Sequence, residues 1–254
     1  MSNSTISKKA RIGKNLKVKD FTIIEDDVEI GDDVEIGSNV LIANGARIAG
    51  NVKIHHGAVI ATQPQDLKFE GEETVLEIGE GTVVREYATL NRGTKHSGKS
   101  LVGKNCFLMA YTHVAHDCYI GDNVIIANGV QMGGHVEIGD WAIVGGLTPI
   151  HQFVKIGAHV MLGGGFRAVK DVPPYILAGE MPLKYEGVNL VGLRRRGFSN
   201  QQIHNIKDAY DLIYRSGLNI SDGVKRIKEN SEIPDEVKAI LDFIEKSNRG
   251  IIRG

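Results

Sequence analysis

This 254-residue chain is poor in the residues that mark several classes of protein. Its two cysteines, Cys106 and Cys118, are too few for a disulfide-stapled framework and fit a reducing compartment. No run of 18 apolar residues occurs, and the opening MSNSTISKKARIG has no hydrophobic signal segment. We therefore expect no integral membrane segment and a cytoplasmic location. A formal net charge of -1 argues against a nucleic-acid partner.

What the chain does have is an aliphatic residue at every sixth position over most of its length. The row consists of Ile12, Val18, Ile24, Ile30, Ile36, Ile42, Ile48, Ile54 and Ile60, then Ile78, Val84 and Leu90, then Val102, Leu108, Val114, Ile120, Ile126, Met132, Ile138, Val144, Ile150, Ile156 and Leu162. A period of six fits neither an amphipathic helix nor a plain strand, and predicts a short strand and turn that stacks on its own copies. The residues four positions after each aliphatic are mostly compact, such as Cys106 and Cys118, and are also predicted to point inward. Glycine directly after many aliphatics, as at Gly13 and Gly31, indicates positive φ or a tight corner.

The pattern resembles the left-handed parallel β-helix of hexapeptide-repeat proteins, in which three hexads make one triangular coil. Coils of that kind stack about 5 Å apart through parallel-sheet hydrogen bonds, so residues 18 apart should share a column. The predicted fold class is mainly β: a left-handed parallel β-helix with a C-terminal α-helical domain.

The hexad row ends at Leu162, and Pro173 and Pro174 lack the N–H donors that a further coil would use. We predict a β-helix over 1–170, a linker over 171–198 and a helical domain over 199–254. Ser199 is an N-cap candidate, and later helices are expected near Ser221 or Asp222 and at Pro234 or Asp235. The first of these helices should bury one face, formed by Ile203, Ile206, Tyr210 and Ile213.

Histidines form a column when the chain is counted in coils. His116, Gly134 and Gln152 are 18 apart, and His135 and His151 are chain neighbours of the last two. Such a polar row beside a glycine suits a small-molecule groove, because imidazole exchanges protons near neutral pH. Two alternatives stay open: ordinary exposed turn residues, and a zinc site, although no cysteine or carboxylate completes a tetrahedral set in the sequence and we predict no metal.

Several segments together resemble the bacterial UDP-N-acetylglucosamine acyltransferase family. They are QPQDLKF (63–69), HVAHDCYIGDN (113–123), GGHVEIGD (133–140), GGLTPIHQFVKIGAHVM (145–161), DVPPY (171–175) and LRRRGFS (193–199). The resemblance covers nearly the whole chain. It implies transfer of an (R)-3-hydroxyacyl chain from acyl carrier protein to the 3-hydroxyl of the sugar in UDP-N-acetylglucosamine, without a cofactor, as the first step of lipid A synthesis.

The resemblance also implies roles for individual residues. His116 would be the general base, oriented by Asp117 or another acceptor, and the backbone N–H of Gly134 would stabilise the oxyanion. Gly164 would limit acyl length, and the glycines around it predict a long chain of about 14 carbons or more, since each buried methylene adds roughly 0.8 kcal/mol. Substrate-holding roles would fall to His113, His135, His151, Gln152, Asp66, Lys68, Asn189, Arg195 and Arg196. Val191 departs from the family glutamate and leaves open whether the acceptor carries a hydroxyl or an amine.

A homotrimer with sites shared between subunits is implied as well. Lys155, Arg167 and Lys170 are expected to help dock the acidic carrier protein. Three other readings remain: a hexapeptide acyltransferase that uses coenzyme A, a zinc hydratase of the same fold, and a scaffold without catalysis.

Overall fold

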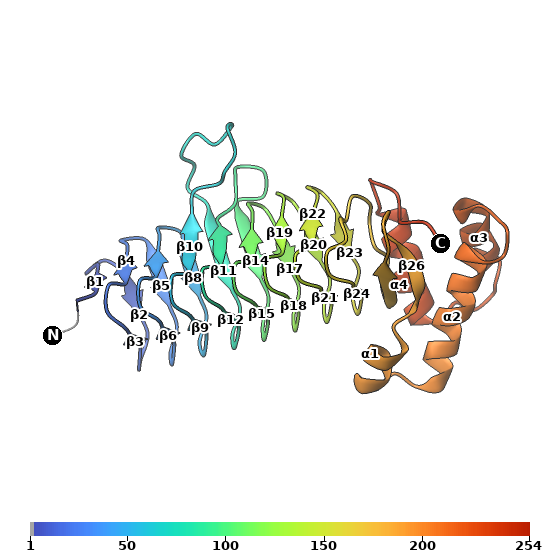
Figure 1. Cartoon of the computed structure of the whole chain (residues 1–254), viewed down its shortest axis with the longest axis horizontal. Coiled ribbons are helices and arrows are strands. Elements are labelled where there is room, and N and C mark those ends of the chain that lie inside the picture. Colours follow the sequence, from blue (N-terminus) through green and yellow to red (C-terminus); the bar gives the residue numbers. More distant parts are fainter. Residues whose placement is uncertain (1–2) are drawn as a thin grey trace.

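The computed structural model describes residues 3–254, and its dominant feature is a triangular prism made of three parallel sheets (Figure 1). The chain visits sheet A, then sheet B, then sheet C, and returns to A one coil further along the axis. The fold is a left-handed parallel β-helix followed by a helical region, as the sequence predicted.

Up to β24, each sheet takes every third strand, and β25 and β26 then extend sheet C. Sheet A contains β1 (Thr5–Ile6), β4 (Ile23–Ile24), β7 (Leu41–Ile42), β10 (Val59–Thr62), β13 (Thr89–Asn91), β16 (His113–Val114), β19 (Gln131–Met132) and β22 (Pro149–Ile150). Sheet B contains β2 (Arg11–Ile12), β5 (Val28–Ile30), β8 (Ala46–Ile48), β11 (Val75–Ile78), β14 (Lys99–Val102), β17 (Tyr119–Ile120), β20 (Glu137–Ile138) and β23 (Lys155–Ile156). Sheet C contains β3 (Lys17–Val18), β6 (Glu35–Ile36), β9 (Lys53–Ile54), β12 (Val83–Val84), β15 (Phe107–Leu108), β18 (Ile125–Ile126), β21 (Ile143–Val144), β24 (Met161–Leu162), β25 (Ile176–Gly179) and β26 (Lys184–Val188).

The aliphatic row forms the core of the prism. Ile120 pairs with Ile138, and Ile138 pairs with Ile156, so residues 18 apart are neighbours as predicted. The row is buried from Ile24 onward, and Cys106 and Cys118 are buried beside it. Val18 is partly buried, and Ile12 is 38% exposed. Ile12 is the most exposed member of the row. It lies in the first coil, which has a neighbouring coil on one side only.

The glycines that follow the aliphatics serve a different purpose from the one expected. None of Gly13, Gly31 or Gly37 is among the residues with positive φ, so the left-handed conformation does not explain them. A Cβ on Gly13 would lie 2.5 Å from the Gly31 carbonyl carbon, and one on Gly31 would lie 2.7 Å from the Gly50 nitrogen. Glycine is required there because adjacent coils touch backbone to backbone. Positive φ occurs two residues further on, as at Asn15 and Asp33.

The three edges of the prism are called AB, BC and CA after the sheets they join. Both interruptions of the hexad row leave at the AB edge: residues 63–74 connect β10 to β11, and residues 92–98 connect β13 to β14. The longer one is the loop that projects above the solenoid in Figure 1. Because both insertions lie on one edge, the other two edges continue undisturbed.

The repeat does not stop at Leu162, which corrects the sequence prediction. Ala168 bridges Ile150 in sheet A, Val172 bridges Ile156 in sheet B, and β25 pairs in parallel with β24 in sheet C. Pro173 and Pro174 do not prevent this, because they lie at the BC edge between the bridged residues. The segment 171–198 was expected to be a linker with extended character. It contains β25, the antiparallel β26 and the helix α1 (Leu190–Arg195).

Three further helices form the cap: α2 (Asn200–Tyr214), α3 (Ile220–Lys228) and α4 (Asp235–Glu245). Ser199 caps α2 in a capping box, and the predicted face of α2 is buried. The α3 helix begins one residue before the earlier of its two predicted starts, with Asn219 as its N-cap. The Tyr210 hydroxyl donates to the Pro174 carbonyl at 2.6 Å and fastens α2 to the last coil. Within residues 3–254, no helix has the length and apolar character that crossing a bilayer would require.

Candidate functional site

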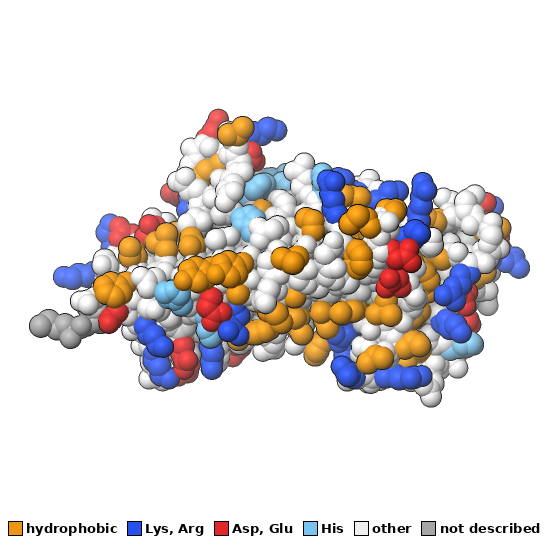
Figure 2. All heavy atoms as spheres, viewed as in Figure 1, with side chains coloured by type: hydrophobic (Ala, Val, Ile, Leu, Met, Phe, Trp, Pro, Cys, Tyr) orange, Lys and Arg blue, Asp and Glu red, His pale blue; other side chains and the backbone are white. Residues whose placement is uncertain are grey.

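The histidines that the 18-residue spacing predicted to be neighbours lie together on the AB edge. His116 and Asp117 follow β16, His135 follows β19, and His151 and Gln152 follow β22, all at the turn from sheet A to sheet B. The His135 N–H donates to the His116 carbonyl at 3.0 Å, which puts consecutive coils in direct contact here. Histidine side chains gather on the surface beside the projecting loop (Figure 2). The predicted row is therefore one continuous edge of the molecule.

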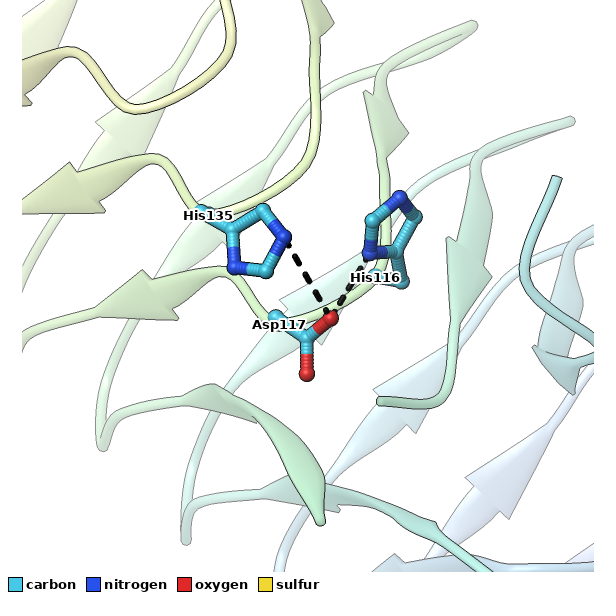
Figure 3. Close-up of side chains that lie close together, drawn as sticks. All are labelled: His116, Asp117 and His135. Carbon is cyan, nitrogen blue, oxygen red and sulfur yellow. Dashed lines mark hydrogen bonds and ion pairs between the residues drawn. The ribbon is translucent and has the colours of Figure 1, made fainter. Parts of the chain in front are cut away.

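His116 and Asp117 form a hydrogen-bonded dyad (Figure 3). His116 Nδ1 lies 2.7 Å from Asp117 Oδ2, and the Asp117 side chain is completely buried. Burial by itself would raise the pKa of Asp117, but hydrogen bonds from Ser97, His116 and Thr94 outweigh it and hold the pKa well below its usual range. An ionised carboxylate only accepts hydrogen bonds, so Nδ1 of His116 carries a proton. In the neutral imidazole, Nε2 therefore has the lone pair.

Gly134 lies directly against the His116 ring. A Cβ at this position would be 2.5 Å from His116 Cε1 and 2.7 Å from Nε2. Any other residue would push the imidazole out of its place. The glycine thus keeps the reactive nitrogen accessible, as the 18-residue spacing suggested.

His135 is packed among aromatic rings. It stacks on Phe153 with ring centroids 4.4 Å apart and meets His116 edge-on at 5.2 Å. Burial lowers the pKa of His135, although the carboxylates of Asp117 and Asp66 act in the opposite direction. His135 is therefore predominantly neutral at pH 7. Phe153, which sequence reasoning missed, lies 18 residues after His135, so the same arithmetic could have found it.

The remaining predicted edge residues lie nearby. His113 is on β16, facing outward, where Nδ1 lies 2.7 Å from the Thr89 hydroxyl and burial lowers its pKa. His151 Nδ1 is 3.1 Å from the Gln152 carbonyl. A cavity of about 880 Å³ opens on the sheet B side of this edge. It is lined by His96, Ser97, Asp117, Tyr119, His135, Glu137, Phe153, Lys155, Asn248 and Arg249.

Asp66 and Lys68 lie on the projecting loop, at the same edge. The Lys68 N–H donates to Asp66 Oδ1 at 3.0 Å, which orders the turn between them. Because the Asp66 carboxylate acts on His135, the loop and the histidine row belong to one electrostatic environment.

Asn189, Arg195 and Arg196 belong to a different edge. Asn189 caps α1 and donates from Nδ2 to the His159 carbonyl at 2.9 Å, and the Arg196 guanidinium lies over the Trp141 ring at 5.4 Å. Trp141 and His159 stand between sheets B and C, so this group is on the BC edge. The two predicted halves of the site do not meet within one chain.

The BC cluster contains two buried polar atoms without partners among residues 3–254: Arg196 Nη1 and His159 Nδ1. Burial, assisted by the Arg196 charge, lowers the pKa of His159 to about 4, so its imidazole is neutral at pH 7. A guanidinium with a free, desolvated donor is suited to an anionic ligand such as a diphosphate.

Gly164 lies on the third edge, CA. A Cβ there would be 2.9 Å from the Gly146 carbonyl oxygen, so packing between coils already explains this glycine. Its predicted role in acyl length remains a prediction.

His116, Asp117 and His135 also have the spacing of a metal site, with ligand atoms all within 4.8 Å of one another. The sequence argument that no carboxylate completes such a set is wrong, since Asp117 is in reach of both rings. The oxygens of Asp117 already accept hydrogen bonds from Thr94 and His116, which occupy lone pairs that a metal ion would need.

Comparison with known proteins places this geometry in a family. Residues 171–252 match the model described as "Udp N-acetylglucosamine O-acyltransferase; Domain 2", and residues 9–44 and 99–134 match that of the bacterial transferase hexapeptide. An acyl-[acyl-carrier-protein]–UDP-N-acetylglucosamine O-acyltransferase of Burkholderia mallei is 43% identical over 206 residues, 79% of each chain. The chain belongs to the UDP-N-acetylglucosamine O-acyltransferase family.

Solved structures of this acyltransferase family superpose on nearly the entire chain. The UDP-N-acetylglucosamine acyltransferase of Bacteroides fragilis is 46% identical, with a TM-score of 0.97 over 100% of this chain and 99% of that one. The Acinetobacter baumannii protein is 40% identical, with a TM-score of 0.95 and the same coverage. The acyltransferase fold thus includes the cap and the projecting loop as well as the coils.

Proposed function

We propose that the chain transfers an (R)-3-hydroxyacyl group from acyl carrier protein to the 3-hydroxyl of UDP-N-acetylglucosamine, in the cytoplasm and as the first step of lipid A synthesis. The observation that carries the proposal is the pairing of His116 with the buried Asp117 carboxylate, beside a residue that has no side chain. The name of the Burkholderia mallei relative specifies the same donor, acceptor and type of reaction.

His116 Nε2 acts as the general base in this mechanism. It takes the proton of the sugar hydroxyl as that oxygen attacks the thioester carbonyl, and Asp117 stabilises the imidazolium that forms. A C–O bond forms and the C–S bond breaks when the tetrahedral intermediate collapses. The imidazolium then returns its proton to the departing thiolate. No cofactor takes part.

Substrate binding falls to the residues around this pair. The Gly134 N–H donates to the oxyanion, where the missing side chain lets the thioester approach. His113, His135, His151 and Gln152 contact the substrates along the edge, and Asp66 and Lys68 hold the sugar from the loop.

The diphosphate is bound by Arg195 and Arg196, with Asn189 beside them. Because these residues lie on the BC edge, they reach the sugar nucleotide at the AB edge of a neighbouring subunit, which requires an oligomer. We propose the homotrimer. The CA edge supports such an assembly: it carries a row of apolar side chains, of which Phe21 is 61%, Tyr111 61% and Leu147 74% exposed. Apolar side chains also run along the solenoid surface in Figure 2.

The acceptor is proposed to be the hydroxyl sugar rather than its amine counterpart. Val191 stands in α1, where the resemblance implies a glutamate, and it is 61% exposed. A hydroxyl has no nucleophilic lone pair comparable to that of an amine, so it depends on the base at His116. Comparing kcat/KM for the two acceptors tests this assignment.

Replacing His116 tests the mechanism. We expect His116→Ala to lower kcat by about 10²-fold or more, within the range of general-base catalysis, while the Kd for the nucleotide sugar stays close to that of the wild type. The assay uses hydroxyacyl carrier protein, with hydroxyacyl coenzyme A as the alternative donor. His204, exposed on α2 and paired with Asp208, provides the matched control His204→Ala. Wild-type turnover in His116→Ala would remove this residue from the mechanism.

A further inference from the structure

The second interruption of the coil, residues 92–98, makes direct contact with the catalytic dyad. The Thr94 N–H donates to Asp117 Oδ1 at 3.0 Å, and the Thr94 hydroxyl donates to Asp117 Oδ2 at 2.8 Å. The Ser97 hydroxyl lies within hydrogen-bond distance of Asp117 Oδ1 and also of the Lys99 carbonyl. Thr94 therefore donates a hydrogen bond to each of the two carboxylate oxygens. The single proton of the Ser97 hydroxyl is shared between two acceptors.

The loop is built so that the Thr94 hydroxyl points at Asp117. The hydroxyl oxygen accepts from the His96 N–H at 3.2 Å, which leaves its proton for the carboxylate. The Gly98 N–H donates to the Thr94 carbonyl at 2.8 Å and closes the turn. A Cβ on Gly93 would be 2.5 Å from the Lys99 nitrogen, so the two stems of the loop touch. These contacts fix the loop against the edge.

We propose that Thr94 is a positioning residue for acyl transfer: it fixes the Asp117 carboxylate so that His116 presents Nε2 to the acceptor hydroxyl. Ser97 is the auxiliary donor. This inference rests on the proposed function, because it needs His116 as the base. Thr94 touches no reacting atom and acts only through Asp117.

The geometry supports this role over simple packing. Asp117 Oδ2 receives both the Thr94 hydroxyl and His116 Nδ1, at 2.8 and 2.7 Å, so the first donor sets the direction in which the second can bind. His135 Nε2 lies 3.8 Å from Oδ2, just beyond hydrogen-bond distance. Without Thr94, the carboxylate could turn toward His135 and leave His116 unsupported.

A pair of substitutions separates positioning from packing. Thr94→Val keeps the shape of the side chain and removes the hydroxyl, whereas Thr94→Ser keeps the hydroxyl and removes a methyl group. We expect Thr94→Val to lower kcat about tenfold, the effect of one lost charge-assisted hydrogen bond, with an unchanged Kd for the nucleotide sugar. Thr94→Ser should stay within about twofold of the wild type, because the bond to the charged oxygen is retained. If Thr94 only fills space, the order of the two variants is reversed.

A double variant tests whether Thr94 acts through Asp117. In an Asp117→Asn background, adding Thr94→Val should lower kcat no further, because the group it positions is already lost. Multiplying effects would overturn the proposal. Thr82→Val is the matched control, since Thr82 is buried and donates to the Gly103 carbonyl at 2.7 Å on the BC edge. Two further results separate this proposal from the proposed function. If the wild type makes no acylated nucleotide sugar, the proposed function fails. If His116→Ala retains turnover, the general-base role on which the positioning proposal rests fails, while the acyl transfer stands.

Discussion

His116, Gly134 and His135 could be brought together from the sequence because they lie in uninterrupted coils, where 18 residues make one turn of the prism. Thr94, Ser97 and His96 could not. The insertion that carries them stretches the coil, and Thr89 pairs with His113 across 24 residues. Inside such a loop the 18-residue spacing no longer predicts which residues are neighbours. The donors to Asp117 could therefore be identified only from the structure.

Gly164 is a residue whose role needs a test that separates backbone packing from acyl length. We predict that the wild type prefers a hydroxyacyl chain of about 14 carbons or more, because each additional buried methylene is worth roughly 0.8 kcal/mol. Gly164→Met should shift the preference in kcat/KM toward chains of about ten carbons, since a filled groove makes longer chains overpack.

Gly164→Ala is the control for that experiment. Its Cβ meets the Gly146 carbonyl just as the methionine Cβ does, but it lacks the longer side chain that would block the end of an acyl chain. An unchanged length preference in Gly164→Met, or the same shift in both variants, would show that Gly164 does not measure the chain.

At the scale of elements, periodicity predicted the strands well and the ends of the solenoid poorly. The hexads predicted every buried column, but they did not indicate the coil through Ala168 and Val172. A proline interrupts a sheet only where a ladder donor is needed, and Pro173 and Pro174 stand at an edge instead. The helix α1 was missed because its six residues are too few to show a helical period.

The solenoid should be most sensitive to substitution in its middle coils. Ile138 is fully buried between two coils, whereas Ile12 is 38% exposed in the first. We expect Ile138→Ala to lower the free energy of unfolding by about 2–5 kcal/mol, the usual range for an aliphatic residue cut to alanine in a core. Ile12→Ala should cost less than about 1 kcal/mol, because little cavity forms at an open end. Urea denaturation at a fixed protein concentration measures both changes. Equal decreases in the free energy of unfolding would contradict the claim that the middle coils are more sensitive than the first.

The whole molecule carries its functional residues on three separate edges. At about 3.3 Å per residue, six residues put neighbouring edges as much as roughly 20 Å apart. The 18-residue spacing could not indicate how the residues on different edges form one site. The three edges run parallel to the solenoid axis, so they do not meet within one chain. The proposed cyclic trimer would pair the AB edge of one subunit with the BC edge of the next.

Complementation between inactive subunits tests this account most directly. His116→Ala lacks the base, and Arg196→Ala lacks the guanidinium, so each homotrimer should give little product at low nucleotide-sugar concentration. The two chains are co-expressed with different tags, and the trimers that carry both tags are isolated. These mixed trimers should regain about a third of the wild-type rate, because one of the three intersubunit pairings in each joins two intact halves. Product is identified by mass spectrometry as the 3-O-hydroxyacyl form of UDP-N-acetylglucosamine, from particles of three times 27.7 kDa. A mixture no more active than its parents would contradict a site shared between subunits.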